Sequence, residues 1–162
     1  MHNVHRCWSG DFYVNRKSLS LSLYSFKIDE NHSKMKLTIL GSGCPSVDLE
    51  RHGPSALIDC GKDAKILIDC GSGVTQRLLE HGVTGKEIDA LLLTHLHSDH
   101  IVDLFQLIIS SWHQGRSQPQ KIYGPRGTKV YVDQLMKLWK PELEQRIAHE
   151  QRSSTKALEV EV

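Results

Sequence analysis

Residues 94 to 100 read Thr-His-Leu-His-Ser-Asp-His, which brings three histidines and one aspartate together within six positions. Zinc and similar divalent ions accept imidazole nitrogen and carboxylate oxygen as ligands, and structural needs alone seldom produce such a density of them. In an extended loop His95 and His97 project to the same side and can bind one ion, whereas Asp99 and His100 can face a second. The spacing therefore predicts a metal site. The alternative is that these side chains only cap a strand end and a helix start.

The segments on either side of this motif predict a loop between a strand and a helix. Residues 90 to 93, Ala-Leu-Leu-Leu, form an uninterrupted apolar run, which is typical of a strand buried on both faces. After the motif, apolar residues recur at steps of three and four, which predicts one buried stripe of an α-helix that ends near Gly115. The members of this stripe are Ile101, Leu104, Phe105, Ile108 and Trp112.

The rest of the chain alternates strands with helices. Three strands joined by glycine-rich turns come first, which predicts a β-meander, and a short helix follows the third strand. This alternation favours a layered α/β fold. The predicted strands are residues 36–40, 55–60, 65–70, 121–123 and 157–162, and the further predicted helices are residues 75–80 and 128–138.

Composition and charge are those of an ordinary globular chain. The 162 residues are 39% hydrophobic and 24% charged, and the formal net charge of +1 neither attracts nor excludes nucleic acid. Residues 1–34 are polar and stop just before Met35, so we expect an N-terminal extension, disordered or foreign to the natural protein, followed by one domain at 35–162. The alternative is an extra strand, since Leu19, Leu21 and Leu23 alternate with serine.

Cysteines and histidines outside the motif form no further pattern. The four cysteines show neither a Cys-x-x-Cys spacing nor the density of a disulfide framework, so a reduced, cytoplasmic setting fits best. We identify no signal peptide and no membrane span, because residues 19 to 26 alternate leucine with serine and lack a cleavage site. The remaining seven histidines, His52 among them, are scattered singly and are expected at solvated or capping positions.

The motif resembles the His-x-His-x-Asp-His signature of the metallo-β-lactamase superfamily. Its context is similar to the ribonuclease Z and arylsulfatase-like branch, with Leu-Gly-Ser-Gly-Cys-Pro after the first strand, Ile-Asp69-Cys-Gly-Ser-Gly before the first helix and Tyr-Gly-Pro-Arg-Gly further on. Each flanking motif is weak alone, but their order and spacing support the resemblance over most of the chain after Met35. The implied fold is the N-terminal half of a metallo-β-lactamase αββα sandwich.

The resemblance implies roles for five residues. His95 and His97 would hold one metal ion, and Asp99 and His100 would hold the other. Both ions are expected to be zinc, with manganese as the alternative. Asp69 would steady the ligand loop by hydrogen bonds from behind it, and such outer contacts orient metal ligands.

Two aspartates compete for that supporting role, because Leu-Ile-Asp-Cys-Gly occurs at residues 57–61 and again at residues 67–71. We favour Asp69, which is followed by Gly-Ser-Gly and a helix as the family pattern requires. Asp59 is followed by a hairpin instead.

The implied reaction is hydrolysis by a metal-activated hydroxide. Two bound ions would lower the pKa of a bridging water and neutralise charge at the attacked phosphorus, sulfur or carbonyl centre. Asp99 would be catalytic as well as a ligand, since it can orient the hydroxide and accept its proton. Related redox proteins carry glutamate at the position of His97, so this histidine favours hydrolysis over oxygen chemistry.

The family completes its site with two more histidines and a bridging aspartate from a second αβ half, and none of them can be matched here. The one histidine after His113 is His149, whose sequence context is that of a helix surface. Stable catalytic zinc takes three protein ligands and a water, whereas this chain offers two per ion. We therefore expect a member that is truncated at its C-terminus.

Three functions follow as alternatives. The first is a ribonuclease Z-like phosphodiesterase acting on RNA, for which residues 116 to 140 offer a local excess of positive charge, unless that charge is only a solvated helix face. The second is an arylsulfatase-like hydrolase of small sulfate, phosphate or carboxylic esters. The third is an inactive fragment without the second half of the metal site. The resemblance also implies a homodimer. The cationic residues are Arg116, Lys121, Arg126, Lys129, Lys137 and Lys140, against the single acid Asp133.

Overall fold

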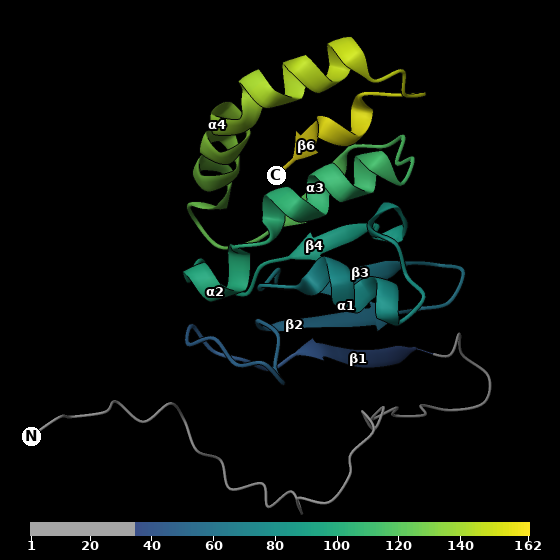
Figure 1. The fold of residues 1–162 in the computed structure, drawn as a ribbon. Helices are drawn as coiled ribbons and strands as arrows, with labels where there is room; N and C mark the ends of the chain where they lie inside the picture. Colours follow the sequence, from purple (N-terminus) through teal and green to yellow (C-terminus); the bar gives the residue numbers. More distant parts are fainter. Residues whose placement is uncertain (1–34) are drawn as a thin grey trace, which may run out of the picture.

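The computed structural model describes residues 35–162 and contains a six-stranded mixed β-sheet (Figure 1). The strands lie in chain order across the sheet; β1, β2 and β3 are antiparallel, as the predicted meander requires, and β4, β5 and β6 add in parallel. The predicted extension at residues 1–34 lies outside the described residues, as does its alternative strand. The strand bounds are β1 (Lys36–Gly41), β2 (Ser55–Asp59), β3 (Lys65–Ile68), β4 (Ala90–Leu92), β5 (Gln120–Tyr123) and β6 (Val160–Glu161).

Helices α1 and α3 lie across one face of this sheet (Figure 1). Leu57, Leu67 and Leu91 lie opposite one another on β2, β3 and β4. They form one core cluster with Leu78 of α1 and Leu107 of α3. Each of these side chains is at most 2% exposed, and burying one of this size stabilises the fold by about 1.5–3 kcal/mol. The helices are α1 (Val74–Glu80), α2 (Ser98–Ile101), α3 (Leu104–His113) and α4 (Thr128–His149), with two 3₁₀ turns, η1 (Gly85–Glu87) and η2 (Lys156–Leu158).

The opposite face of the sheet is apolar but exposed. Leu92 of β4 pairs with Tyr123 of β5, and these residues are 36% and 56% exposed, while Ile39 on β1 is 53% exposed. The prediction that residues 90 to 93 are buried on both faces is therefore wrong for this face, although Leu91 and Leu93 are buried on the other. The reason is that the described helix residues of the main core pack on the Leu91 side. In an αββα sandwich, a second sheet covers such a face.

The helix predicted after the motif is two helices rather than one. α2 ends at Ile101, and Asp103 interrupts the helical path before α3 begins. The Asp103 backbone N–H donates to the Cys70 carbonyl at 3.1 Å, and its carboxylate accepts from the Gly73 N–H at 2.9 Å. These bonds hold Asp103 against the turn between β3 and α1. The spacing of apolar residues could not reveal this break, because both helices keep their apolar sides toward the same core.

Helix α4 is longer than the sequence predicted, because it continues past Pro141 to His149. Its first part packs through Val132 on the main core, and Leu143 joins a smaller cluster with Trp112. The predicted strand at residues 157–162 is shorter than expected, since η2 occupies its beginning. Within the described part of the chain, no helix combines the length and the apolar character that crossing a membrane requires.

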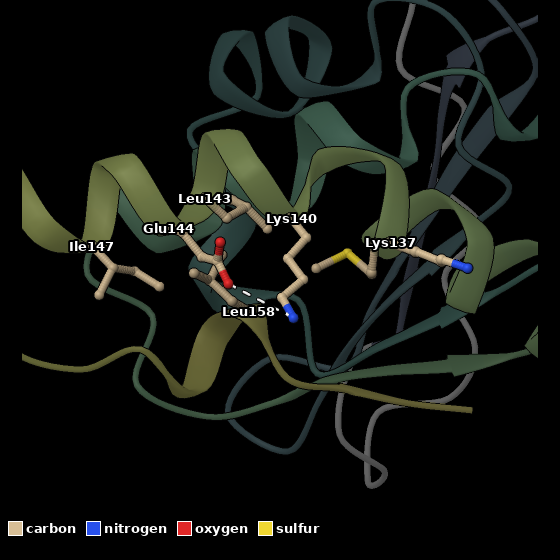
Figure 2. Close-up of a pocket in the computed structure, with 7 residues that line it drawn as sticks. Lys137, Lys140, Leu143, Glu144, Ile147 and Leu158 are labelled. Atoms are coloured by element: carbon tan, nitrogen blue, oxygen red, sulfur yellow. Dashed lines mark ion pairs between the residues drawn. The ribbon is translucent and has the colours of Figure 1, made fainter.

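An apolar groove of about 380 Å³ lies between α4 and η2. Figure 2 shows Leu143, Ile147 and Leu158 around it, with the ion pair between Lys140 and Glu144 beside them. No residue of the His-rich motif lines this groove. The predicted metal ligands therefore lie outside this groove.

Candidate metal centre

The three imidazoles of the motif converge at the end of β4. The ring centroid of His95 lies 4.5 Å from that of His97 and 4.0 Å from that of His100. His95 and His97 come from the loop after the strand, and His100 from α2, in which Asp99 also lies. His100 Nε2 is 3.7 Å from the Asp99 carboxylate. The structure thus brings the four predicted ligand residues to one place.

Asp69 lies directly behind this cluster and is only 5% exposed. Its carboxylate accepts hydrogen bonds from His100 Nδ1 at 2.7 Å, from the Thr94 N–H at 2.8 Å and from the Thr94 hydroxyl at 2.8 Å. Asp69 has a φ of 57°, a left-handed conformation that is unfavourable for a residue with a side chain and has to be held by its surroundings. With Nδ1 engaged in this way, Nε2 is the His100 nitrogen that remains available as a ligand.

Sequence reasoning missed the contribution of Thr94, which orients Asp69 through two groups and also lies 3.0 Å from His95 Nδ1 through its hydroxyl. Its place as the first residue of the motif was the available signal. Asp59, the competitor of Asp69, is the last residue of β2, where the hairpin to β3 begins. There it accepts from the Gly61 N–H at 2.7 Å and pairs with Lys65 at 3.7 Å.

Glycines allow three backbone segments to meet beside the motif. A Cβ on Gly71 would lie 2.4 Å from the Gly53 carbonyl carbon and 2.7 Å from the Asp99 carbonyl oxygen. The Gly53 N–H donates to the Ser72 carbonyl at 2.9 Å, and the Gly71 N–H to the Pro54 carbonyl at 3.2 Å. The glycine-rich turn after Asp69 therefore has a physical reason, since any larger residue there would push the motif helix away.

A cleft of about 460 Å³ opens next to the motif. The long loop from β1 to β2 forms one wall, and Ser72, Ser98 and Asp99 form the other. Asp99, one of the predicted ligands, lines this cleft.

A family model described as Anti-Pycsar protein Apyc1 matches residues 35–160. The chain belongs to this family. Ribonuclease Z of Mycolicibacterium gilvum is 43% identical to it over 118 residues, and ribonuclease Z of Mycobacterium marinum is 42% identical over 118 residues. Each match covers 71% of this chain but only 41% and 42% of those proteins. The chain spans about two fifths of the length of the curated relatives it matches.

Solved structures give the same fold. Human tRNase Z, short form, is 30% identical with a TM-score of 0.58, and covers 64% of this chain and 39% of its own. The metallo-β-lactamase fold protein YhfI from Bacillus subtilis is 28% identical with a TM-score of 0.54, over 62% of this chain and 40% of its own. These likenesses confirm the predicted superfamily and fold: the Apyc1-family chain has the N-terminal half of a metallo-β-lactamase αββα sandwich.

The donor groups of this Apyc1-family chain fit part of a metal site. The cluster offers imidazole nitrogens and one carboxylate, which suit zinc. Within residues 35–162, however, no group of three or more His, Cys, Asp or Glu side chains is placed so that it could hold a metal ion by itself. His149 does not contribute, since it ends α4 and its Nδ1 is bonded to the Gln145 carbonyl at 2.7 Å. The described residues supply ligands but no complete coordination sphere.

In this Apyc1-family chain, fewer of the cations counted over residues 116 to 140 are available to bind phosphate than the sequence suggests. Arg116 is buried and donates to the backbone carbonyls of Ile88 at 2.6 Å and Pro119 at 2.9 Å. Lys129 pairs with Asp133 at 2.9 Å. A phosphate backbone could therefore not reach the Arg116 guanidinium.

Arg116 should instead be a stabilising residue of the Apyc1-family fold. Replacing it with methionine leaves the Ile88 and Pro119 carbonyls without a donor, and we expect the free energy of unfolding to fall by about 3 kcal/mol. Urea unfolding followed by circular dichroism measures this change. The control is Lys121→Met on an exposed position of β5, which should cost less than about 0.5 kcal/mol. Equal effects of the two variants would contradict the assignment.

Proposed function

We propose that this chain carries the first half of the active site of a ribonuclease Z-like metal-dependent hydrolase that cleaves phosphodiesters. The observation that supports it is the convergence of His95, His97 and His100, with His100 oriented by the buried carboxylate of Asp69. The names of the curated relatives support a phosphodiester substrate, and RNA is the first candidate. The proposal includes a cytoplasmic, reduced setting, with which the free thiols of Cys44, Cys60 and Cys70 are compatible.

The residues would divide the work as follows. His95 and His97 would bind one ion, Asp99 and His100 the other. When bound, zinc or manganese makes hydroxide available near neutral pH and neutralises charge on the attacked phosphorus. Asp99 would accept the proton of the attacking water, because it lies at the edge of the cleft in which the substrate would bind. Asp69 would hold the His100 ring in one orientation throughout.

A small ester is the second candidate substrate, and the charge distribution favours it. Of the cations predicted for RNA binding, Arg116 is buried, and Lys129 and Lys140 pair with acids on α4. RNA binding draws its affinity from cations that reach phosphates. An arylsulfatase-like hydrolase of small sulfate, phosphate or carboxylic esters needs no such surface.

The deciding assay compares precursor tRNA, an aryl phosphodiester and an aryl sulfate with the polypeptide as its gene encodes it, loaded with zinc or manganese. We expect both phosphodiesters to be cleaved, and a chelator to abolish the cleavage. Cleavage of the aryl sulfate alone would favour the second candidate. A rate unaffected by the chelator would rule out the metal mechanism.

Metal affinity gives a test that does not need turnover. Asp69→Asn keeps the size of the side chain but weakens the acceptor for His100, and we expect zinc affinity to fall about 10- to 100-fold. Competition with a zinc-binding dye measures it. Asp59→Asn is the matched control, because it has the same sequence neighbours and lies in the hairpin. Equal losses in both variants would show that Asp69 has no special role.

A further inference from the structure

His52 occupies a fixed position on the wall of the cleft, although its sequence context predicted only a solvated or capping residue. It belongs to the loop between β1 and β2. Its carbonyl accepts from the Gly43 N–H at 2.7 Å, and the next residue, Gly53, donates to the Ser72 carbonyl at 2.9 Å. The backbone on both sides of His52 is thus tied to other segments, which fixes the point from which its side chain leaves the loop.

The imidazole itself packs against Gly73. This glycine has a φ of 81°, and a Cβ built on it would lie 2.1 Å from His52 Nδ1. Any other residue at position 73 would displace the ring. The Asp103 carboxylate is close by, accepting from the Gly73 N–H at 2.9 Å. Burial raises the pKa of the Asp103 carboxyl, while the N–H groups of Gly73 and Val74 and the nearby His52 act against that rise.

The cleft that His52 lines combines a polar end with an apolar wall. Ser98 and Asp99 lie at the motif end, and Val47 and Leu49 on the loop are 93% and 99% exposed. Such apolar side chains can pack against a planar ring.

Arg51, the neighbouring cation of the same wall, is paired with Asp48 at 3.0 Å. Its guanidinium is therefore partly neutralised. His52 lies near Asp103 and also lines the cleft, so its imidazole offers a nitrogen donor to an anion bound there.

We propose that His52 is a substrate-binding residue, whose imidazole donates a hydrogen bond to a non-bridging oxygen of a phosphodiester while Val47 and Leu49 contact an aromatic ring attached to it. The ligand class is a phosphodiester that carries a nucleobase or an aryl group. This inference rests on the proposed hydrolase function, which it extends from the metal ligands to the group that holds the substrate.

The test measures binding in the absence of metal, so that it does not depend on turnover. Bis(p-nitrophenyl) phosphate is titrated into the 162-residue chain in the presence of a chelator, and amide NMR shifts are recorded. We expect shifts at Val47, Leu49 and Ser98. His52→Ala should raise the Kd about tenfold, whereas His52→Gln, which keeps an N–H donor, should raise it less. His149→Ala, on the exposed end of α4, is the control and should leave the Kd unchanged.

Three results would overturn the proposal: no shifts at the cleft residues in the wild type, an unchanged Kd in His52→Ala with native amide dispersion, or equal losses in the alanine variants of His52 and His149. The proposed function fails separately. If the ligand binds at the cleft but the metal-loaded gene product does not hydrolyse it, the hydrolase function is contradicted and the binding site is still supported. If the gene product hydrolyses the ligand but His52→Ala leaves the Kd unchanged, only the proposed role of His52 is contradicted.

Discussion

The 162-residue chain, purified alone and loaded with zinc or manganese, should hydrolyse no aryl phosphodiester faster than the free metal does. The reason is the number of ligands. His95, His97, Asp99 and His100 give two per ion, where a catalytic zinc takes three and a water. Within residues 35–162 no larger ligand group is arranged around one ion, so we expect the metal to be weakly held and to leave on desalting.

The exposed sheet face adds a second expectation for the isolated chain. Ile39, Leu92 and Tyr123 form apolar surface that invites association between copies. Elemental analysis after desalting measures the retained metal, and light scattering measures association. The rate with and without chelator measures metal-dependent hydrolysis. Two tightly held ions with a chelator-sensitive rate would contradict the prediction, and would mean that a second chain completes the coordination. A homodimer in which each chain completes the metal coordination of the other would give this result.

Asp99→Ala should abolish turnover in the hydrolytically competent protein, because it removes a metal ligand and the group that accepts the proton. Loss of a general base alone costs about a hundredfold to ten-thousandfold in rate. The measurement is kcat at saturating zinc, together with thermal unfolding to show that the fold persists. Asp133→Ala is the control, since Asp133 is exposed on α4 and pairs only with Lys129 among the described residues. Unchanged turnover at saturating zinc would count decisively against the role of Asp99.

Local sequence patterns predicted the elements that carry the motif. The apolar run at residues 90 to 93 and the helical spacing after it correctly placed His95 and His97 in the loop after β4, although His100 already lies in α2. The glycine turns correctly predicted the meander. These features depend on neighbours within a few positions. The resemblance, rather than any periodicity, pointed to Asp69, and its role in the metal site stays a prediction.

Contacts between distant residues could not be predicted in this way. His100 lies 31 positions from Asp69, and Asp103 lies 30 from Gly73, yet these bonds orient the ligand loop and break the helix after it. Arg116 counts as one more positive charge in the sequence, and only its burial against the Ile88 carbonyl shows that its charge is not available to RNA. His52 has no informative neighbours in the sequence, and only the structure shows its imidazole packed against Gly73.

The order of the strands has a consequence for how the protein is made. Each strand from β2 to β6 pairs with the one before it in the chain, so the sheet can grow one strand at a time as a ribosome releases the polypeptide. The loop that carries His95 and His97 lies between β4 and β5, which pair in parallel. The segment between β4 and β5 also contains α2 and α3, so once β5 has emerged and paired, this segment is held at both ends by paired strands. His100 can then bond to Asp69 while translation of the following residues continues.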